Sequence, residues 1–269
     1  MMRGLIKSVL VCVLMVLAVV NVVVAHSGTR NLAMGNTGVA YSDDPFSVWT
    51  NPAGLGLTMF PQLQLDIEAQ PQGSLRYVLN YVEPDYGTGA GGLSLAYTQE
   101  KDSDSQFMAA YAVGALFHTN LGIGLTVRYH NEVGAPDQYF AGDFGLQFGH
   151  DWPVRLGITA ENIVAKALGD TDTNPELAIR TGLAIPVLDR GLVTVEVGNL
   201  LAEGTNRELR VGVEVVVIES LTVRGGWQQY VSHKGENPWT AGVSYAQDRY
   251  RLDYGWEQSK HLLGLSLGL

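Results

Sequence analysis

The sequence predicts an all-β fold, a transmembrane antiparallel β-barrel of about 14 strands with a short N-terminal hatch segment inside the barrel. Three observations predict it. The chain begins like an exported protein, and from about Gln62 to the C-terminus apolar residues alternate with polar residues or glycine. The composition is 46% hydrophobic, with 32 glycines and only 16% charged residues. After the first residues, no apolar stretch reaches the roughly 20 residues of a membrane helix, so strands must cross the membrane.

The first element, residues 1–25, is predicted to be a signal peptide. Arg3 and Lys7 precede an unbroken apolar run from Ser8 to Ala25, and Val23 and Ala25 fit a small-residue cleavage site. The alternative is a single transmembrane anchor, because the run is nearly long enough to span a bilayer. We expect cleavage, because the following residues resemble folded-protein sequence. The only cysteine would leave with this segment, so the mature chain would have no disulfide.

The second element, residues 26–61, does not alternate and is predicted to be a hatch, or plug. Asp43 is a good N-cap and Pro45 fits a first helical turn, so a short helix is expected near residues 44–50. Asn51 and Pro52 would end it, because proline restricts the preceding residue. The segment is too short for a core of its own, so its apolar residues must pack inside the barrel; they are Met34, Val39, Phe46, Val48 and Trp49.

The third element, residues 62–269, is predicted to be the transmembrane β-barrel. Val193, Val195 and Val197, for example, would lie on one face of a strand, because successive side chains point to opposite faces. A soluble barrel or sandwich is the alternative, but so many glycines on the polar face would fill its core badly. The predicted strands centre near residues 66, 77, 94, 111, 125, 144, 157, 181, 196, 213, 225, 241, 252 and 265.

The polar face, assigned to the lumen, carries balanced charges. Its bases and acids are Arg76, Arg128, Arg155, Arg180, Arg210, Arg224, Arg251, Asp66, Glu68, Asp143, Glu161, Glu196, Glu214 and Asp253. Pairs across neighbouring strands, such as Glu196 with Arg210 and Glu214 with Arg224, would form a charge ladder that holds the wall together. A selective ion path is the alternative, but one sign of charge should then dominate. The lumen glycines Gly124, Gly157, Gly182, Gly212, Gly242 and Gly264 allow either open space or close approach of a plug.

The segment "AMGNTGVAYSDDPFSVWTNPAGL" resembles the N-terminal signature of the FadL-like outer-membrane proteins, closest to the PorV/PorQ branch, which includes proteins associated with type IX secretion. The later segments "LGITAENI" and "ELAIRTGLAIP" are similar to strand patterns of that branch. The resemblance implies a 14-stranded barrel with an N-terminal hatch, located in the bacterial outer membrane. Hydrophobic molecules pass through transport members of this family and leave sideways through the wall. The hatch and ligand-path residues expected here are Asp43, Asp44, Pro45, Phe46, Trp49, Asn51, Pro52, Ala53 and Gly54.

This chain departs from the family pattern in two ways. It is much shorter than the fatty-acid transporters, so the long outer loops that capture their ligand are missing. It also ends in Leu269, where many outer-membrane barrels end in an aromatic residue. The function expected is therefore passive transport of small hydrophobic solutes, and the alternative is a non-transporting, PorV-like docking barrel for secreted or surface proteins. Expected partners are outer-membrane lipid and either a small hydrophobic ligand or a secreted protein.

The remaining motifs give no case for catalysis, a metal or a cofactor. The run Gly87–Gly92 fits a dinucleotide-binding pattern, but a strand follows it where that pattern needs a helix. The run Gly264–Gly268 fits a nucleophile elbow, but no residues remain after it for an acid and a histidine. The six histidines are scattered without ligand spacing. The net charge of −10 argues against binding nucleic acid.

Overall fold

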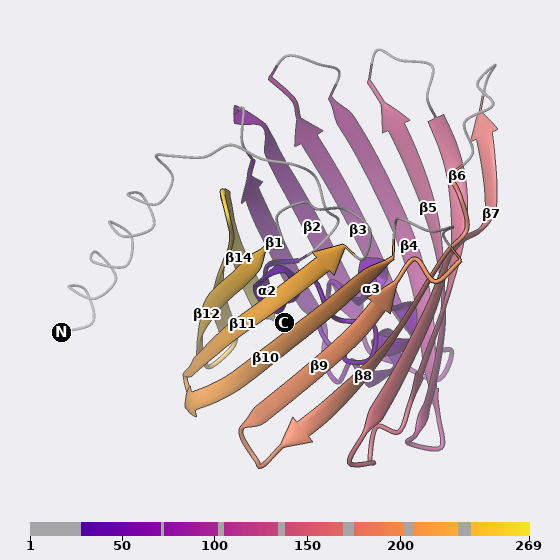
Figure 1. Ribbon diagram of the computed structural model, residues 1–269. Helices are drawn as coiled ribbons and strands as arrows, with labels where there is room; N and C mark the ends of the chain where they lie inside the picture. The colour runs from indigo at the N-terminus through magenta and orange to yellow at the C-terminus, as the bar shows by residue number, and fades with distance from the viewer. Residues whose placement is uncertain are drawn as a thin grey trace.

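The computed structural model is a closed barrel of 14 antiparallel strands, which confirms the predicted fold class (Figure 1). It describes residues 28–70, 73–101, 105–133, 138–168, 175–201, 207–230 and 238–269. The predicted signal peptide, residues 1–25, lies outside these ranges. Among the described residues, no helix is long and apolar enough to cross a membrane.

Each strand pairs with its neighbours in sequence, and β1 pairs with β14 to close the barrel. The strands are β1 (Gln62–Ala69), β2 (Leu75–Glu83), β3 (Ala90–Gln99), β4 (Gln106–Phe117), β5 (Leu121–Glu132), β6 (Gln138–Phe148), β7 (Arg155–Leu168), β8 (Ala178–Val187), β9 (Gly191–Gly198), β10 (Glu208–Ile218), β11 (Leu221–Tyr230), β12 (Trp239–Gln247), β13 (Tyr250–Glu257) and β14 (Lys260–Gly268). Every predicted strand centre falls inside one of them. We call the end where β1 begins and β14 ends the base of the barrel, and the opposite end the rim.

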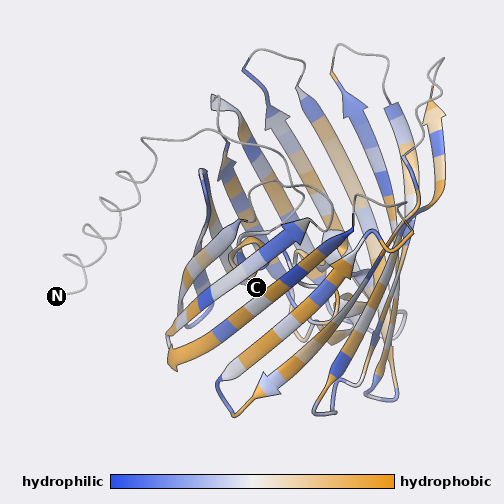
Figure 2. Ribbon diagram, viewed as in Figure 1, coloured by the Kyte–Doolittle hydropathy of each residue, from blue (hydrophilic) through white to orange (hydrophobic). Residues whose placement is uncertain are grey.

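The outer surface of the barrel is apolar and the inner surface is polar. On β5, Leu125 and Val127 are 53% and 57% exposed, whereas Thr126 between them is 2% exposed. Figure 2 shows the same alternation of hydrophobic and hydrophilic residues along most strands. In a closed barrel every backbone hydrogen bond is made between strands, so an apolar outer belt can face lipid. The barrel is therefore built to span a bilayer.

A β-bulge interrupts the wall between β6 and β7. Gly142 pairs with Val164, but Phe144 pairs with Ala160, so β7 has extra residues opposite Asp143. Asn162 lies in the bulge with a φ of 60°, a left-handed conformation that asparagine tolerates better than most residues. Its backbone N–H donates to Asp143 at 2.9 Å, and Arg128 donates to both Asp143 and the Asn162 side chain. A lumen ion pair therefore stabilises the bulge.

The hatch contains α2 (Thr29–Ala33), α3 (Ser47–Thr50) and the 3-10 helix η1 (Pro52–Leu57). The helix predicted near residues 44–50 is shorter than expected and begins at Ser47, without a side-chain cap. Asp43 does not cap it, because its carboxylate pairs with Arg30. Asp44 instead shapes the preceding turn, accepting hydrogen bonds from the backbone N–H groups of Phe46 and Ser47. The helix ends before Asn51 as predicted, but α2 and η1 were not predicted.

Candidate functional site: the hatch and its contacts with the barrel wall

The hatch occupies the interior of the barrel (Figure 1, indigo). Its residues are almost all buried, and Leu32, Ala33, Val39, Ala53 and Leu55 have no exposed surface. The fully buried apolar side chains of the protein are concentrated here, between the hatch and the inner wall. The hatch therefore forms much of the core of the fold, inside the barrel.

Glycines of the inner wall allow the hatch backbone to lie directly against the strands. A Cβ at Gly226 of β11 would lie 2.1 Å from the backbone nitrogen of Gly35, and one at Gly124 of β5 would lie 2.2 Å from the carbonyl carbon of Pro52. The wall glycines whose Cβ would come within 3.0 Å of the hatch are Gly92, Gly114, Gly122, Gly124, Gly145, Gly157, Gly212, Gly226, Gly242 and Gly255.

These distances show which of the two predicted roles, open space or close approach of the hatch, each lumen glycine has. Gly124, Gly157, Gly212 and Gly242 permit close approach of the plug and not open space. At Gly264 the nearest hatch atom, Thr29 Oγ1, would lie 3.0 Å from a Cβ. Gly182 is the exception, because its nearest hatch atoms lie at 3.7 Å, an ordinary contact distance. The hatch and the wall are thus complementary in shape along most of the barrel circumference.

Arg30, in α2, is the main ionic anchor of the hatch. Its guanidinium donates to both carboxylate oxygens of Glu214 on β10, at 3.0 and 2.8 Å, and pairs with Asp43 at 2.5 Å. Its side chain is only 9% exposed. Burial alone would lower the pKa of Arg30, but Glu214 and Asp43 raise it well above its usual value. Burial raises the pKa of Asp44, with Arg30 opposing the shift.

Glu196 of β9 forms a second anchor, because its carboxylate accepts hydrogen bonds from the backbone N–H groups of Gly38 and Val39 at 3.0 and 3.1 Å. The same carboxylate pairs with Arg210 at 2.9 Å and with Arg180 at 3.4 Å. These two arginines also donate to the hatch carbonyls of Asn36 and Thr50. The predicted pair of Glu196 and Arg210 is therefore present, and it holds the hatch as well as the wall.

Most of the other predicted ladder residues also pair. Glu214 lies 2.5 Å from Arg224, as predicted. The remaining pairs are Glu68 with Arg76, Arg128 with Asp143, Arg180 with Glu161, and Asp253 with both Arg224 and Arg251. Asp66 forms no ion pair within the described part of the chain; it accepts hydrogen bonds from the backbone and hydroxyl of Thr29 at 3.2 and 2.6 Å. Arg155 is treated separately below.

Several of the predicted ligand-path residues lie at the hatch–wall contact. Phe46 packs against Val78, Ala96 and Met108 of β2, β3 and β4, and the Trp49 indole donates to Ser94 at 2.5 Å. Pro52 begins η1, and a Cβ on Gly54 would lie 1.7 Å from the carbonyl oxygen of Ser42, so only glycine fits there.

Asn51 ties several hatch segments to the wall and has no exposed surface. Its amide donates to the carbonyls of Val39 and of Leu146 on β6, at 2.6 and 3.0 Å. Its side-chain oxygen accepts from the backbone N–H of Ala53, a member of η1 that is also fully buried. Truncation of Asn51 would leave these buried polar groups without partners, which is costly.

Several residues that hold the hatch were missed in the sequence. Arg30 and Thr29 were not predicted to contact the wall. Two further residues were also missed: Thr37, whose hydroxyl lies 2.7 Å from that of Thr194, and Asn36, whose side-chain amide donates to Glu257. Their sequence carries no periodic signal, because each contact depends on how the hatch winds through the lumen. Among the described residues, no group of three histidines, cysteines or carboxylates could hold a metal ion.

Comparison with solved structures places the fold among FadL-like barrels. The toluene transporter TodX of Pseudomonas putida matches with a TM-score of 0.66 and 13% identity, over 92% of this chain and 98% of that one. The toluene transporter TbuX of Ralstonia pickettii matches with a TM-score of 0.61 and 13% identity, over 90% and 98%. A FadL homologue of Pseudomonas aeruginosa matches with a TM-score of 0.60 and 11% identity, over 93% and 97%.

At such low identity these likenesses show the fold alone. They support the FadL-like architecture and give no support to the PorV/PorQ branch suggested by the N-terminal motif. Two of the three proteins are described as toluene transporters and the third as a FadL homologue. No family model and no curated protein matches the chain.

Proposed function

We propose that this protein is a channel of the bacterial outer membrane through which small hydrophobic solutes pass without an energy source, and that the hatch, residues 26–61, is its gate. The apolar outer belt supports the location. The position of the described hatch supports the gate, because the hatch lies inside the barrel against glycines of β3 to β7 and β10 to β13, where it would obstruct a solute. The toluene transporters of the same fold support the class of solute.

The observation that carries the proposal is an unequal distribution of polarity around the hatch. On the side of β2, β3 and β4, the hatch contacts an apolar sector of the wall, formed by Val78, Val82, Ala90, Ala96, Met108, Ala110 and Ala112. Phe46, Val48 and Leu55 of the hatch pack there, with Trp49 beside them. The lumen face of β2 also carries Arg76, paired with Glu68 of β1. The charged wall side chains that bond to the hatch most extensively, however, lie on β8, β9 and β10; they are Arg180, Glu196, Arg210 and Glu214. A hydrophobic solute would therefore pass along the apolar sector, while the ionic side keeps the hatch attached.

The test is the entry of toluene and sucrose into vesicles that contain the purified protein. The vesicles need lipopolysaccharide in the outer leaflet, because toluene dissolves readily in a plain phospholipid bilayer. We expect toluene to enter faster than into protein-free vesicles and sucrose to stay outside, because the hatch obstructs the lumen. Deletion of residues 26–61 should admit both solutes. Toluene entry no faster than in protein-free vesicles would contradict the channel.

The docking role remains a distinct outcome of the same experiment. If the intact protein excludes both solutes and only the deletion variant admits them, the barrel is closed at rest. Recovery of a secreted or surface protein together with the barrel would then support docking. Recovery of the barrel alone would count against it.

A further inference from the structure

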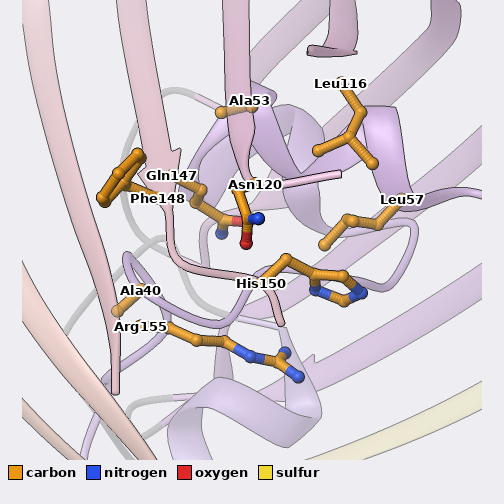
Figure 3. Close-up of a pocket in the computed structure, with 10 residues that line it drawn as sticks. Ala40, Ala53, Leu57, Leu116, Asn120, Gln147, Phe148, His150 and Arg155 are labelled. Atoms are coloured by element: carbon orange, nitrogen blue, oxygen red, sulfur yellow. The ribbon is translucent and has the colours of Figure 1, made fainter. Parts of the chain in front are cut away.

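Buried polar atoms that have no hydrogen-bond partner in the described chain mark two places where the hatch meets the wall. The first is a small pocket at the base, between the hatch and the ends of β4 to β7, where the atoms are Nδ1 of His150 and Nε of Arg155 (Figure 3). Unlike the other predicted ladder arginines, Arg155 has no ion pair among the described residues, and its guanidinium lies 4.8 Å from the centre of the Tyr41 ring. The pocket has room for about one water molecule, so it admits no larger ligand.

The second place is a row of three uncharged polar side chains on the lumen face of β1, β2 and β3. Asn80 of β2 pairs across the strands with Gln64 of β1 and with Ser94 of β3. Residues that lie opposite each other on one face have Cβ atoms about 4.5–5.5 Å apart, so these side chains adjoin. Asn80 and Ser94 have no exposed surface, and Gln64 is 2% exposed. We call these three residues the polar row.

Asn80 is the least satisfied member of the polar row. Within the described chain, neither the nitrogen nor the oxygen of its side-chain amide has a hydrogen-bond partner, and the side-chain oxygen of Gln64 has none either. The amide nitrogen of Gln64 donates to Asp66 at 2.7 Å. The lumen neighbours of Asn80 on β2 are Val78 and Val82, whose side chains cannot form hydrogen bonds. Because buried polar groups are normally paired, the row points to a ligand that supplies both a donor and an acceptor.

The hatch places an aromatic ring with a single donor against this row. Trp49 is partly buried and packs against both apolar clusters of the sector, the one that contains Val82 and the one that contains Val78. Its indole N–H donates to Ser94 at 2.5 Å, but an indole has no acceptor for the amide of Asn80. A one-ring aromatic solute with a hydroxyl would suit the same apolar surroundings, and its hydroxyl can both donate and accept. The indole thus indicates the kind of molecule that the row can hold.

We propose that the polar row and the apolar sector around it bind a one-ring phenol, whose ring takes the place of the Trp49 indole when the hatch moves. The ring lies against Val78 and Val82, and the hydroxyl bonds to Asn80 and Ser94. The inference rests on the proposed function and deepens it, because it names the class of solute and makes Asn80 a specificity-determining residue. A site with buried polar groups rejects an analogue that leaves those groups unpaired. The site should therefore prefer p-cresol to toluene, which is the same molecule without the hydroxyl.

The experiment is calorimetric titration of the purified full-length protein, in a zwitterionic detergent, with p-cresol and with toluene. The ratio of the two affinities is compared between the unaltered protein and Asn80→Leu, which puts an apolar side chain of similar size into the apolar sector. Partition into detergent is the same for both proteins, and a change in hatch stability acts on both solutes, so neither affects this comparison. We expect the preference for p-cresol to fall at least about twofold in the variant, because a hydrogen bond is lost. An unchanged ratio, or no binding of p-cresol to the unaltered protein, would overturn the proposal.

Two further variants locate the site. The matched control Asn131→Leu removes an amide near the rim end of β5, outside the polar row, and should leave the ratio unchanged. Trp49→Ala should tighten the binding of p-cresol, because no indole has to be displaced. Unchanged affinity in folded Trp49→Ala would show that the solute does not replace the indole and would overturn the assignment. Entry into vesicles remains a separate test: a protein that binds p-cresol as expected but admits neither solute would contradict the channel and not the site.

Discussion

Replacement of Gly226 by valine is expected to displace the α2 end of the hatch and to let sucrose enter vesicles. A Cβ at Gly226 would lie 2.1 Å from the backbone nitrogen of Gly35 and 2.3 Å from the carbonyl carbon of Met34. These are backbone atoms, so no flexible side chain can move aside. Overpacking of this kind costs roughly 1–3 kcal/mol, which corresponds to an increase of about 5- to 160-fold in the ratio of displaced to docked hatch. The rate of sucrose entry measures the displaced fraction.

The neighbouring residue provides the matched control. Gly225 lies on the same strand but faces outward, and a Cβ there would meet its nearest atom at 3.9 Å. Gly225→Val should therefore leave sucrose outside. Both variants should keep the heat-resistant gel mobility of a closed barrel, since neither removes a strand pair. If Gly226→Val excluded sucrose as well as Gly225→Val does, close packing of the hatch on the wall would not be what closes the lumen.

Replacement of Arg30 by glutamine is expected to release the hatch through a different contact. The substitution removes the partner of Asp43 and one of the two partners of Glu214. Loss of one member of a buried ion pair costs about 3–5 kcal/mol, and because Glu214 keeps Arg224 we expect the lower end. Labelling of a cysteine in the hatch measures the release. In a Cys12→Ser, Ser47→Cys background the thiol replaces a hydroxyl that is 1% exposed, and its labelling rate should rise about 100-fold.

A double variant separates the ion pair from general destabilisation. Arg30→Gln combined with Glu214→Gln removes both charges, so labelling should be slower than in Arg30→Gln alone, because Glu214 no longer carries a buried charge that has lost one of its two partners, and Arg224 keeps Asp253. Arg190→Gln, on the exposed surface, should leave labelling unchanged. Equal labelling rates in the single and double variants would show that Glu214 is not the group that Arg30 neutralises.

The barrel could be predicted in detail because its pattern is local. In every strand an apolar residue must face outward at alternate positions, so each predicted strand centre lies within an observed strand, and the pairs Glu196–Arg210 and Glu214–Arg224 follow from neighbouring register. The bulge at Asn162 was not predicted, since it depends on the contacts of that residue with Asp143 and Arg128.

The hatch was predicted less well, because no period governs it. The end of the helix at Asn51 and Pro52 could be predicted, because proline restricts the residue before it. The helix η1 was not predicted, and the helix expected from residue 44 begins at Ser47. The reason is Arg30, whose burial against Glu214 draws Asp43 into an ion pair and away from the helix terminus. The charge ladder was expected to hold the wall, but Glu196, Arg180 and Arg210 also bind hatch backbone groups. Such contacts between distant residues leave no trace in a single sequence.

A reversible lock between the hatch and the wall tests the central claim most directly. A Cβ at Gly92 of β3, in the apolar sector, would lie 2.6 Å from the Cγ2 of Val48 in the hatch, so cysteines at these two positions would lie within reach of a disulfide. In a Cys12→Ser background, Val48→Cys with Gly92→Cys should form a disulfide on oxidation. We predict that toluene entry then falls to the rate of protein-free vesicles and returns on reduction. Toluene entry that continues unchanged through the oxidised protein would contradict a channel gated by the hatch.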